Sequence, residues 1–466
     1  MRADRASLNP APNLQVLVRK ISIADARSAL KDEEDGLTSL EAITLEGFGT
    51  HHQKPVLIDY AYDGGSKAVG YVMGLNSVTD FWDRTAHAVD DPLREAWSTG
   101  KVRAEIKHET ATEGKASAAW YRRTKPFQDY ACRIEGPALT DLHRNFVTAW
   151  NREAPFPWRI PMHDVPPSIK PVVDGNDVQI VRTQPQEKEK TIKALYLQAT
   201  SFARNYIYIE NQYFFYPAFA RHLKNERLNF CKAWSRLSGK PISEAPKLHL
   251  FIVLPHPEQD GMVPRTLDTL TELGRGDAMP KQVDLVDAGK VDQRYSGAHK
   301  GPKGNLVLDR PSLRDLEDTF GLKVSVARLR TSGLDANNRM AYREIYIHSK
   351  LMLIDDVFVT LGSANINQRS MAVDSEINMA ATGLAKVSEL RRRVFELHSG
   401  GKISGTGKRD QVPDVFHDWT RQMNRNRDIR MAGVRNLEGS VLPFEDHRSA
   451  ALMVASVTVP ASSSSV

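Results

Sequence analysis

The chain has 466 residues, of which 41% are hydrophobic and 26% are charged, and its formal net charge is +6. This length predicts two or three domains, or one large domain of two halves, and no apolar run approaches the roughly 18 residues that cross a bilayer. Two cysteines outside any Cys/His cluster exclude a disulfide framework and a structural zinc site, while the positive charge fits a phosphate-rich partner and a mildly basic protein equally well.

The N-terminal residues contain no apolar segment of the kind that a secretory signal requires. We therefore expect the protein to be cytoplasmic in the producing cell, or exported by a route that uses no cleavable signal peptide. Peripheral membrane contact is compatible with both expectations, because basic surfaces are attracted to anionic lipid headgroups.

The first motif is the stretch THHQKPVLID, in which His52, Lys54 and Asp59 frame a short apolar run. Because side chains alternate along a strand, His52 and Lys54 are expected on the same face. A predicted return strand at 68–72 follows a glycine-rich turn and brings Asn76 back to the same end. The first half thus offers an imidazole, an ammonium group and a carboxamide.

A segment rich in proline, glycine and aspartate at 167–178 predicts a joint between two halves. We assign residues 1–178 to the first half and residues 179–450 to the second. The small residues of 451–466 predict a disordered tail.

Helical and apolar strand patterns alternate in the second half. They predict an amphipathic helix at 187–204 and buried strands at 206–209 and 248–254, which is typical of an α/β layered fold. Residues 281–340 mix charge with glycine and proline, and they predict a loop-rich insertion around a strand at 323–326.

The first motif returns as IHSKLMLID, where His348, Lys350 and Asp355 repeat its spacing. Two copies with the same Leu-Ile-Asp ending are improbable by chance and indicate an internal duplication. A hairpin return strand then leads to Ser363 and Asn365. Each half therefore offers the same three chemical groups.

Two such half-sites facing each other suit an anionic tetrahedral centre. The lysines and asparagines would neutralise and hydrogen-bond the oxygens of a phosphodiester, with no metal or other cofactor. One neutral histidine would attack phosphorus, and the other, protonated, would donate to the leaving oxygen. Asp59 and Asp355 either share in this catalysis or, because each follows a buried strand, hold the turn.

These features resemble the two-copy phospholipase D superfamily over most of the chain, from about residue 47 to about residue 378. The stretch YIYIENQYF at 206–214 is similar to the IENQYF strand of true phospholipases D, and IEGPA at 134–138 and Arg182 with Thr183 match further segments. The resemblance implies an α/β fold of two similar α/β/α layered halves, related by a pseudo-twofold axis, with the active site at their interface. A shortened first half with an exposed sheet edge is expected, because few residues precede His52.

The resemblance also implies roles for individual residues. His52 would be the nucleophile and His348 the general acid and base, while carboxylates orient the two rings, Asp83 in the first half and Glu376 in the second. Substrate phosphate-binding roles are expected for Asn76, Ser363 and Asn365. Pocket-lining roles are expected for the polar residues of the IENQYF strand, Glu210, Asn211 and Gln212.

The expected function is hydrolysis of glycerophospholipids at a membrane surface to phosphatidic acid and a free headgroup, through a phosphohistidine, with transfer to alcohols as a side reaction. The alternatives are nuclease or phosphatidyltransferase action within the same superfamily, or an inactive truncated relative that binds phosphate-bearing membranes. No nucleic-acid partner is expected, because the sequence shows no basic groove interleaved with aromatic residues. A resemblance to bacterial lipase effectors would add a secretion-system or immunity partner.

Overall fold

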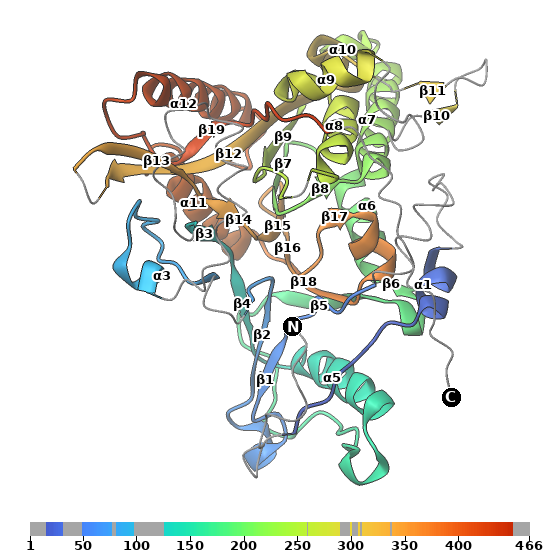
Figure 1. Ribbon diagram of the computed structural model, residues 1–466. Helices are drawn as coiled ribbons and strands as arrows, with labels where there is room; N and C mark the ends of the chain where they lie inside the picture. Colours follow the sequence, from blue (N-terminus) through green and yellow to red (C-terminus); the bar gives the residue numbers. More distant parts are fainter. Residues whose placement is uncertain are drawn as a thin grey trace, which may run out of the picture.

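The computed structural model describes residues 15–30, 49–76, 81–96, 125–258, 260–288, 299–300, 306–307, 310–335 and 338–450. These residues form a mixed α/β structure in which a large sheet carries helices on both faces and a smaller sheet lies beside it (Figure 1). The α/β class predicted from the sequence is confirmed. The tail predicted at 451–466 lies outside the described residues.

The described helices are α1 (Ile23–Leu30), α3 (Pro92–Ala96), α5 (Leu139–Glu153), α6 (Thr191–Ser201), α7 (Pro217–Ser238), α8 (Met262–Glu272), α9 (Pro280–Asp287), α10 (Leu313–Phe320), α11 (Leu384–Ser399) and α12 (Val412–Ala432). The strands of the first half are β1 (Val56–Ile58), β2 (Val69–Met73), β3 (Phe127–Gln128) and β4 (Ala131–Ile134). The next strands are β5 (Asp177–Gln184), β6 (Glu189–Lys190), β7 (Tyr206–Asn211), β8 (Phe214–Phe215), β9 (Leu248–Val253), β10 (His299–Lys300) and β11 (Leu306–Val307). The last strands are β12 (Leu322–Leu334), β13 (Met340–Glu344), β14 (Tyr346–Ile347), β15 (Lys350–Ile354), β16 (Phe358–Gly362), β17 (Ile366–Asn367), β18 (Glu376–Thr382) and β19 (Val441–Pro443).

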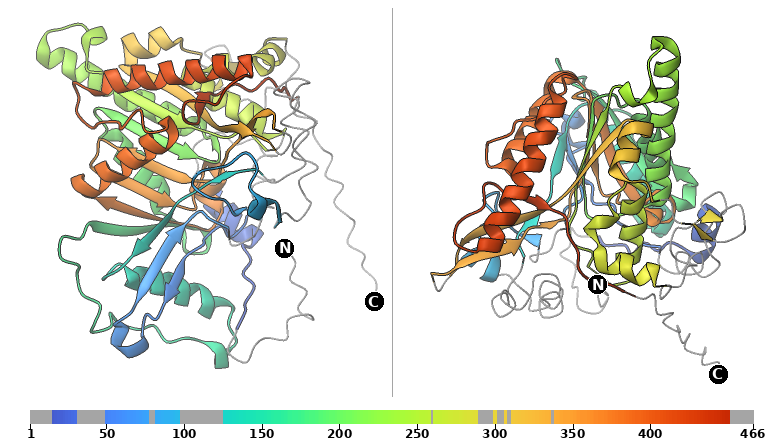
Figure 2. Two further views of the ribbon diagram at one scale, coloured as in Figure 1. Left: turned by 90° about the vertical axis from the view of Figure 1, so that its left-hand side faces the viewer. Right: turned by 90° about the horizontal axis from the view of Figure 1, so that it is seen from above.

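The large sheet has ten strands in the order β13-β12-β9-β7-β15-β16-β18-β5-β6, with β19 paired to β12. Alternate side chains of β7 point to opposite faces of the sheet. Ile207 and Ile209 pack in one cluster with residues of α6, α7 and α8, whereas Tyr206 and Tyr208 pack in another with residues of α11 and α12. Figure 2 shows the strands between these two helical layers. Strand β15, which carries the second motif, is therefore buried on both faces between β7 and β16.

The small sheet has three strands in the order β1-β2-β4, and helix α5 covers one of its faces. Val72 of β2 and Ile134 of β4 pack with Leu142 of α5 in the same buried cluster that contains Leu353 of β15. This shared apolar cluster joins the two sheets and holds the two motifs near each other.

The strands of the small sheet repeat the arrangement of β15, β16 and β18. In both sets the first strand pairs antiparallel with the second, and the second with the third. Alignment of the two histidines places Val56 at the position of Met352, and their strand partners, Tyr71 and Thr360, then correspond. The strands that carry the motifs are therefore related by pseudo-twofold symmetry.

The outer face of the small sheet is exposed where its counterpart is buried. Val56 and Ile58 are 42% and 43% exposed, whereas the equivalent Met352 and Ile354 are 1% and 3% exposed beneath the helical layer of α6 and α7. In the described part of the chain β1 is also an edge strand of its sheet.

Most of the elements predicted in the second half are present. The helix predicted at 187–204 is the shorter α6, and the strands predicted at 206–209 and 248–254 are β7 and β9. The interpretation of 281–340 as a loop-rich insertion is wrong in part, because α9, α10 and the long β12 lie there. The exposed faces of the two helices are charged, and this charge concealed their amphipathic pattern.

No helix among the described residues combines the length and the apolar character that a membrane span needs.

Candidate active site

Two histidine–lysine pairs lie at the starts of equivalent strands. Lys350 is the first residue of β15 and His348 lies two residues before it, while His52 and Lys54 lie just before β1. Lys54 Nζ donates to the carbonyl of His52 at 2.6 Å, and Lys350 Nζ donates to the carbonyl of His348. His348 is buried, whereas the side chain of His52 is 35% exposed. Each ammonium group thus lies beside its own histidine.

The backbones of the two motifs are held by the opposite halves of the chain. The N–H groups of His52 and the next residue donate to the carbonyl of Ser375 at 2.9 and 3.1 Å. The N–H groups of His348 and the next residue donate to the carbonyl of Gln128 at 2.9 and 3.2 Å. This reciprocal pattern places both motifs at the junction of the halves.

The carboxylates that contact the two rings also cross between the halves. His52 Nδ1 lies 3.0 Å from Glu376 Oε1, and His348 Nδ1 lies 2.8 Å from Asp129 Oδ2. Asp129 and Glu376 are structurally equivalent. In each set of strands one residue pairs with the last residue of the second strand, β2 or β16, and the carboxylate lies two residues before that paired residue. A carboxylate on Nδ1 fixes the tautomer of each ring and supports its imidazolium form.

Both ring-orienting predictions need correction. Glu376 does hold a histidine, but it is the ring of the opposite half. The prediction for Asp83 is wrong, because its carboxylate accepts hydrogen bonds from His87 at 2.7 Å, Arg94 at 2.8 Å and the N–H of Phe127 at 2.9 Å. Asp83 therefore supports the segment that leads to Asp129 instead of a catalytic ring.

The second nitrogen of His52 is held by Thr50. His52 Nε2 lies 2.8 Å from Thr50 Oγ1. With the proton on Nδ1, which faces a carboxylate, the Nε2 lone pair is the acceptor in this contact, and the Thr50 hydroxyl also lies 3.2 Å from Asp374 Oδ1. Arg369 donates to Thr50 Oγ1 and to Asp374 Oδ1, each at 3.0 Å, and Asp374 Oδ2 lies 3.6 Å from His52 Nδ1. The contact of Nδ1 with Glu376 thus favours the tautomer that a nucleophile at Nε2 requires.

Among the described residues, His52, Asp374 and Glu376 each place one potential metal ligand within 4.8 Å of the others. Glu376, however, already accepts hydrogen bonds from Ser363 at 2.6 Å and Ser370 at 2.7 Å besides its contact with His52. We therefore assign this group to positioning the ring. Ser363, which was expected at the phosphate, is buried and supports Glu376 instead.

Two of the predicted carboxamides remain suited to a phosphate. Asn365 Nδ2 lies 3.4 Å from Gln212 Oε1, which also accepts from Lys350 Nζ at 2.9 Å. Asn365 Oδ1, which can only accept, has no hydrogen-bond partner among the described residues, so a contact with a phosphate oxygen would use Nδ2. Asn76 is half-buried after β2 at the equivalent position, and its role stays a prediction.

Gly74 allows the two halves to approach closely at this site. A β-carbon there would lie 3.0 Å from the carbonyl oxygen of Gly362, 3.1 Å from the side chain of Lys350 and 3.3 Å from Asp129. Any larger side chain would push against the lysine and the carboxylate that serve the second motif. The glycine is therefore explained by this close contact.

The motif aspartates lie at the other ends of their strands. The carboxylate of Asp355 accepts the N–H groups of Arg204 at 2.7 Å, Asn205 at 2.9 Å and Tyr206 at 2.8 Å. Asp355 and Asp59 have left-handed φ values of 51° and 53°. The structure thus corrects a catalytic assignment for Asp355 in favour of the turn, and Asp59 occupies the equivalent turn.

Of the three residues expected to line the pocket, Gln212 reaches Lys350. Asn211 Oδ1 accepts the N–H groups of Tyr213 and Ile366, each at 3.2 Å, and so joins two backbone segments. Glu210 is completely buried below the second motif and binds four groups, namely the hydroxyls of Tyr130, Tyr208 and Ser349 and the His398 imidazole. Asn211 and Glu210 are therefore structural supports and do not line the pocket.

Burial dominates the electrostatics of the second motif. It lowers the pKa of Lys350 to about 7, with a further lowering by Lys54, while Asp129 opposes the shift. Burial and the charge of Lys350 lower the pKa of His348 to about 4, although its bond to Asp129 opposes this. Burial also lowers the pKa of Lys54. Burial therefore shifts all three groups toward their neutral forms, and a bound anion would favour their charged forms.

Asp129, Thr50 and Asp374 were not identified from the sequence. Asp129 lies 219 positions from the histidine that it contacts. It belongs to no motif, and its role follows only from the strand register that makes it equivalent to Glu376. Thr50 adjoins the first motif, so its polar side chain two residues before His52 was the available signal.

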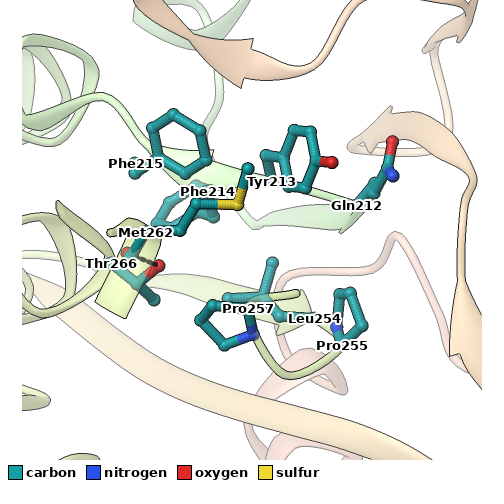
Figure 3. Close-up of a pocket in the computed structure, with 9 residues that line it drawn as sticks. All are labelled: Gln212, Tyr213, Phe214, Phe215, Leu254, Pro255, Pro257, Met262 and Thr266. Carbon is teal, nitrogen blue, oxygen red and sulfur yellow. Dashed lines mark hydrogen bonds between the residues drawn. The ribbon is translucent and has the colours of Figure 1, made fainter. Parts of the chain in front are cut away.

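A small pocket lies next to Gln212, between β8, the loop after β9 and the start of α8 (Figure 3). Its lining is mostly apolar and consists of Gln212, Tyr213, Phe214, Phe215, Leu254, Pro255, Pro257, Met262 and Thr266. In Figure 3 the hydroxyl of Tyr213 turns toward Gln212. The pocket therefore borders the candidate active site at the side of Lys350.

The chain matches the family model described as "Phospholipase D" at residues 19–170 and 323–390. It is 29% identical over 405 residues to phospholipase D alpha 1 of Cynara cardunculus, an alignment that covers 75% of this chain and 48% of that protein. It is 27% identical over 416 residues to phospholipase D alpha 2 of Arabidopsis thaliana, which covers 75% of this chain and 47% of that protein. The chain thus spans about half the length of the curated relatives that it matches.

Solved structures also show similarity. NucT from Helicobacter pylori aligns with a TM-score of 0.24 and 13% identity, covering 48% of this chain and 96% of NucT. A phosphatidylserine synthase from Haemophilus influenzae aligns with a TM-score of 0.32 and 12% identity, covering 83% of this chain and 71% of that chain.

Proposed function

Because the chain belongs to the phospholipase D superfamily, we propose that it hydrolyses the distal phosphodiester bond of glycerophospholipids, releasing phosphatidic acid and the headgroup. The proposal rests chiefly on one observation, the pairing of each histidine with a carboxylate from the opposite half. Two rings held in this way beside two lysines form a site for one phosphodiester group between the halves.

In the first step, His52 Nε2 attacks phosphorus and forms an N–P bond. The hydrogen bond from Thr50 must be released for this attack, while Glu376 balances the positive charge that develops on the ring. Lys54, Lys350 and the Asn365 amide stabilise the oxygens of the trigonal-bipyramidal transition state. The bond from phosphorus to the headgroup oxygen breaks, and protonated His348 donates its proton to that oxygen.

The second step reverses these roles. Neutral His348 removes a proton from water, the water oxygen attacks phosphorus, and the N–P bond to His52 breaks. An alcohol in place of water would give transfer of the phosphatidyl group. Protonation of His348 in the first step requires the bound substrate, because the negative charge of the substrate offsets the burial that lowers the pKa of this ring to about 4.

The direct test is headgroup release from vesicles of phosphatidylethanolamine and phosphatidylcholine in the presence of EDTA. The wild-type protein should release ethanolamine and choline, and His52→Ala should lower the rate by about a thousandfold or more. The matched control is His417→Ala, which removes an exposed histidine on α12, and it should keep the wild-type rate. No release by the wild type, or an unchanged rate in His52→Ala, would reject the proposal.

A further inference from the structure

Glu258 presents an exposed carboxylate beside the candidate active site, in the loop between β9 and α8. Its Oε2 accepts a hydrogen bond from the hydroxyl of Tyr213 at 2.9 Å, and its Oε1 accepts one from the hydroxyl of Tyr346. The two hydroxyls hold the carboxylate in one position but do not neutralise it. Glu258 is therefore an ordered negative charge that faces solvent.

Gln212 connects this carboxylate to the lysine of the second motif. Its amide nitrogen donates to the hydroxyl of Tyr346 at 2.8 Å, and its amide oxygen accepts from Lys350 Nζ at 2.9 Å. The charge of Glu258 also acts on the ammonium group of Lys350. The site thus has a cationic end at Lys350 and an anionic end at Glu258, separated by one glutamine and one tyrosine.

The anionic end lies on the same side as His348. The ring of Tyr346 has its centroid 6.5 Å from that of His348, and Phe81 has its centroid 4.9 Å from the same ring. Phe127 lies 5.1 Å from Tyr346. Because His348 is the proposed proton donor, the headgroup departs on this side. Aromatic rings near a carboxylate are well suited to an organic ammonium ion.

We propose that Glu258, held by Tyr213 and Tyr346, binds the ammonium group of an amine headgroup such as ethanolamine or choline. This inference rests on the proposed function, because it assigns the headgroup class at the same site. These lipids carry a negative phosphate and a positive nitrogen, so their two charges are opposite in sign to those of Lys350 and Glu258. A glycerol headgroup has no charge for Glu258 to bind.

The test is a competition within one vesicle, which removes differences in surface charge between lipids. Vesicles contain equal amounts of phosphatidylethanolamine and phosphatidylglycerol, and the ethanolamine and glycerol released are measured together. The wild type should prefer ethanolamine release, and Glu258→Gln should lower the ethanolamine-to-glycerol ratio by about tenfold, as expected for loss of one charge partner. The glutamine keeps the hydrogen-bonding shape and removes only the charge.

The matched control is Glu389→Gln, which removes one exposed carboxylate on α11 and should leave the ratio unchanged. A ratio in Glu258→Gln equal to that of the wild type would overturn the inference, as would a wild type that shows no preference for ethanolamine. A wild type without this preference overturns the inference even if the variant fails to fold.

If the protein releases no headgroup at all, the proposed function is rejected. The headgroup inference is then tested by a binding measurement. Calorimetry would then compare phosphocholine with glycerol 3-phosphate on the wild type and on Glu258→Gln. A wild-type preference for phosphocholine that falls by about tenfold in the variant supports the ammonium site. Equal binding of the two ligands by the wild type contradicts it.

Discussion

At the scale of single residues, each histidine depends on a carboxylate from the other half of the chain. Asp129 holds His348 at 2.8 Å and Glu376 holds His52 at 3.0 Å. The site therefore cannot form within one half, and the two carboxylates are as important for ring orientation as the histidines are for chemistry. Asp129 is the less obvious of the pair, because no motif marks it.

Asp129→Asn should lower kcat by at least about a hundredfold, because an amide can stabilise the wrong tautomer of His348 and cannot balance its charge. The contrasting variant is Asp83→Asn, which weakens the buried hydrogen bonds that the Asp83 carboxylate makes with His87 and Arg94. It should lower the free energy of unfolding by about 3 kcal/mol with a smaller effect on kcat. Steady-state kinetics and urea unfolding separate the two effects. Equal loss of kcat in both variants would contradict the assignment of Asp129.

Anion binding should take up protons above neutral pH. Burial lowers the pKa of Lys350 to about 7, so at a pH of about 8 most of this side chain is neutral in the empty site. A bound phosphate favours the ammonium form and raises the pKa, so binding takes up about one proton and affinity falls as pH rises through 7.

Calorimetry with inorganic phosphate in buffers of different ionisation enthalpy measures this uptake. At a pH of about 5.5 the contribution of Lys350 should vanish, because the side chain is already protonated before binding. Lys350→Met should remove it at the higher pH. Proton uptake that is identical in this variant and the wild type would contradict the prediction.

At the scale of elements, the duplicated strands are equivalent in register but not in burial. The large sheet covers Met352 and Ile354 with helices, whereas the equivalent Val56 and Ile58 are more than two-fifths exposed. The same residue type at equivalent positions should therefore contribute very differently to stability.

Ile354→Ala should lower the free energy of unfolding by about 3 kcal/mol, because it leaves a cavity in a closed core. Ile58→Ala should lower it by less than about 1 kcal/mol, because water already reaches that side chain. Urea unfolding of the two variants provides the measurement. A similar loss in both would mean that the face of β1 is covered in solution.

The sequence predicted those parts of the site that depend on local spacing. The apolar runs at 206–209 and after Lys350 predicted β7 and β15, and the repeated spacing of histidine and lysine drew attention to the two motifs. The partners of the rings could not be predicted in this way, because each contact joins positions 219 or 324 residues apart and depends on how the halves pack. Asp83 was chosen for its place soon after the first motif, although Arg94 and His87 satisfy its carboxylate.

At the scale of the whole molecule, the net charge of +6 leads us to predict an electrostatic attraction to anionic membranes. The protein should sediment with vesicles that contain phosphatidylglycerol at low ionic strength and be released at about 0.5 M salt, because screening weakens surface attraction. Vesicles of phosphatidylcholine alone should bind less protein. Equal binding to both kinds of vesicle at every salt concentration would contradict an electrostatic contact.

The central claim is that phosphodiester cleavage proceeds through a covalent bond from phosphorus to His52. It is tested most directly with a radiolabelled phosphatidyl-p-nitrophenol, whose leaving group needs no proton, followed by quenching and peptide mapping. The His348→Ala variant should release one burst of nitrophenol and retain the label on the peptide that contains His52, while His52→Ala should show neither. Label on the peptide of His348 in His52→Ala, or no labelled peptide in any variant that releases nitrophenol, would contradict the account.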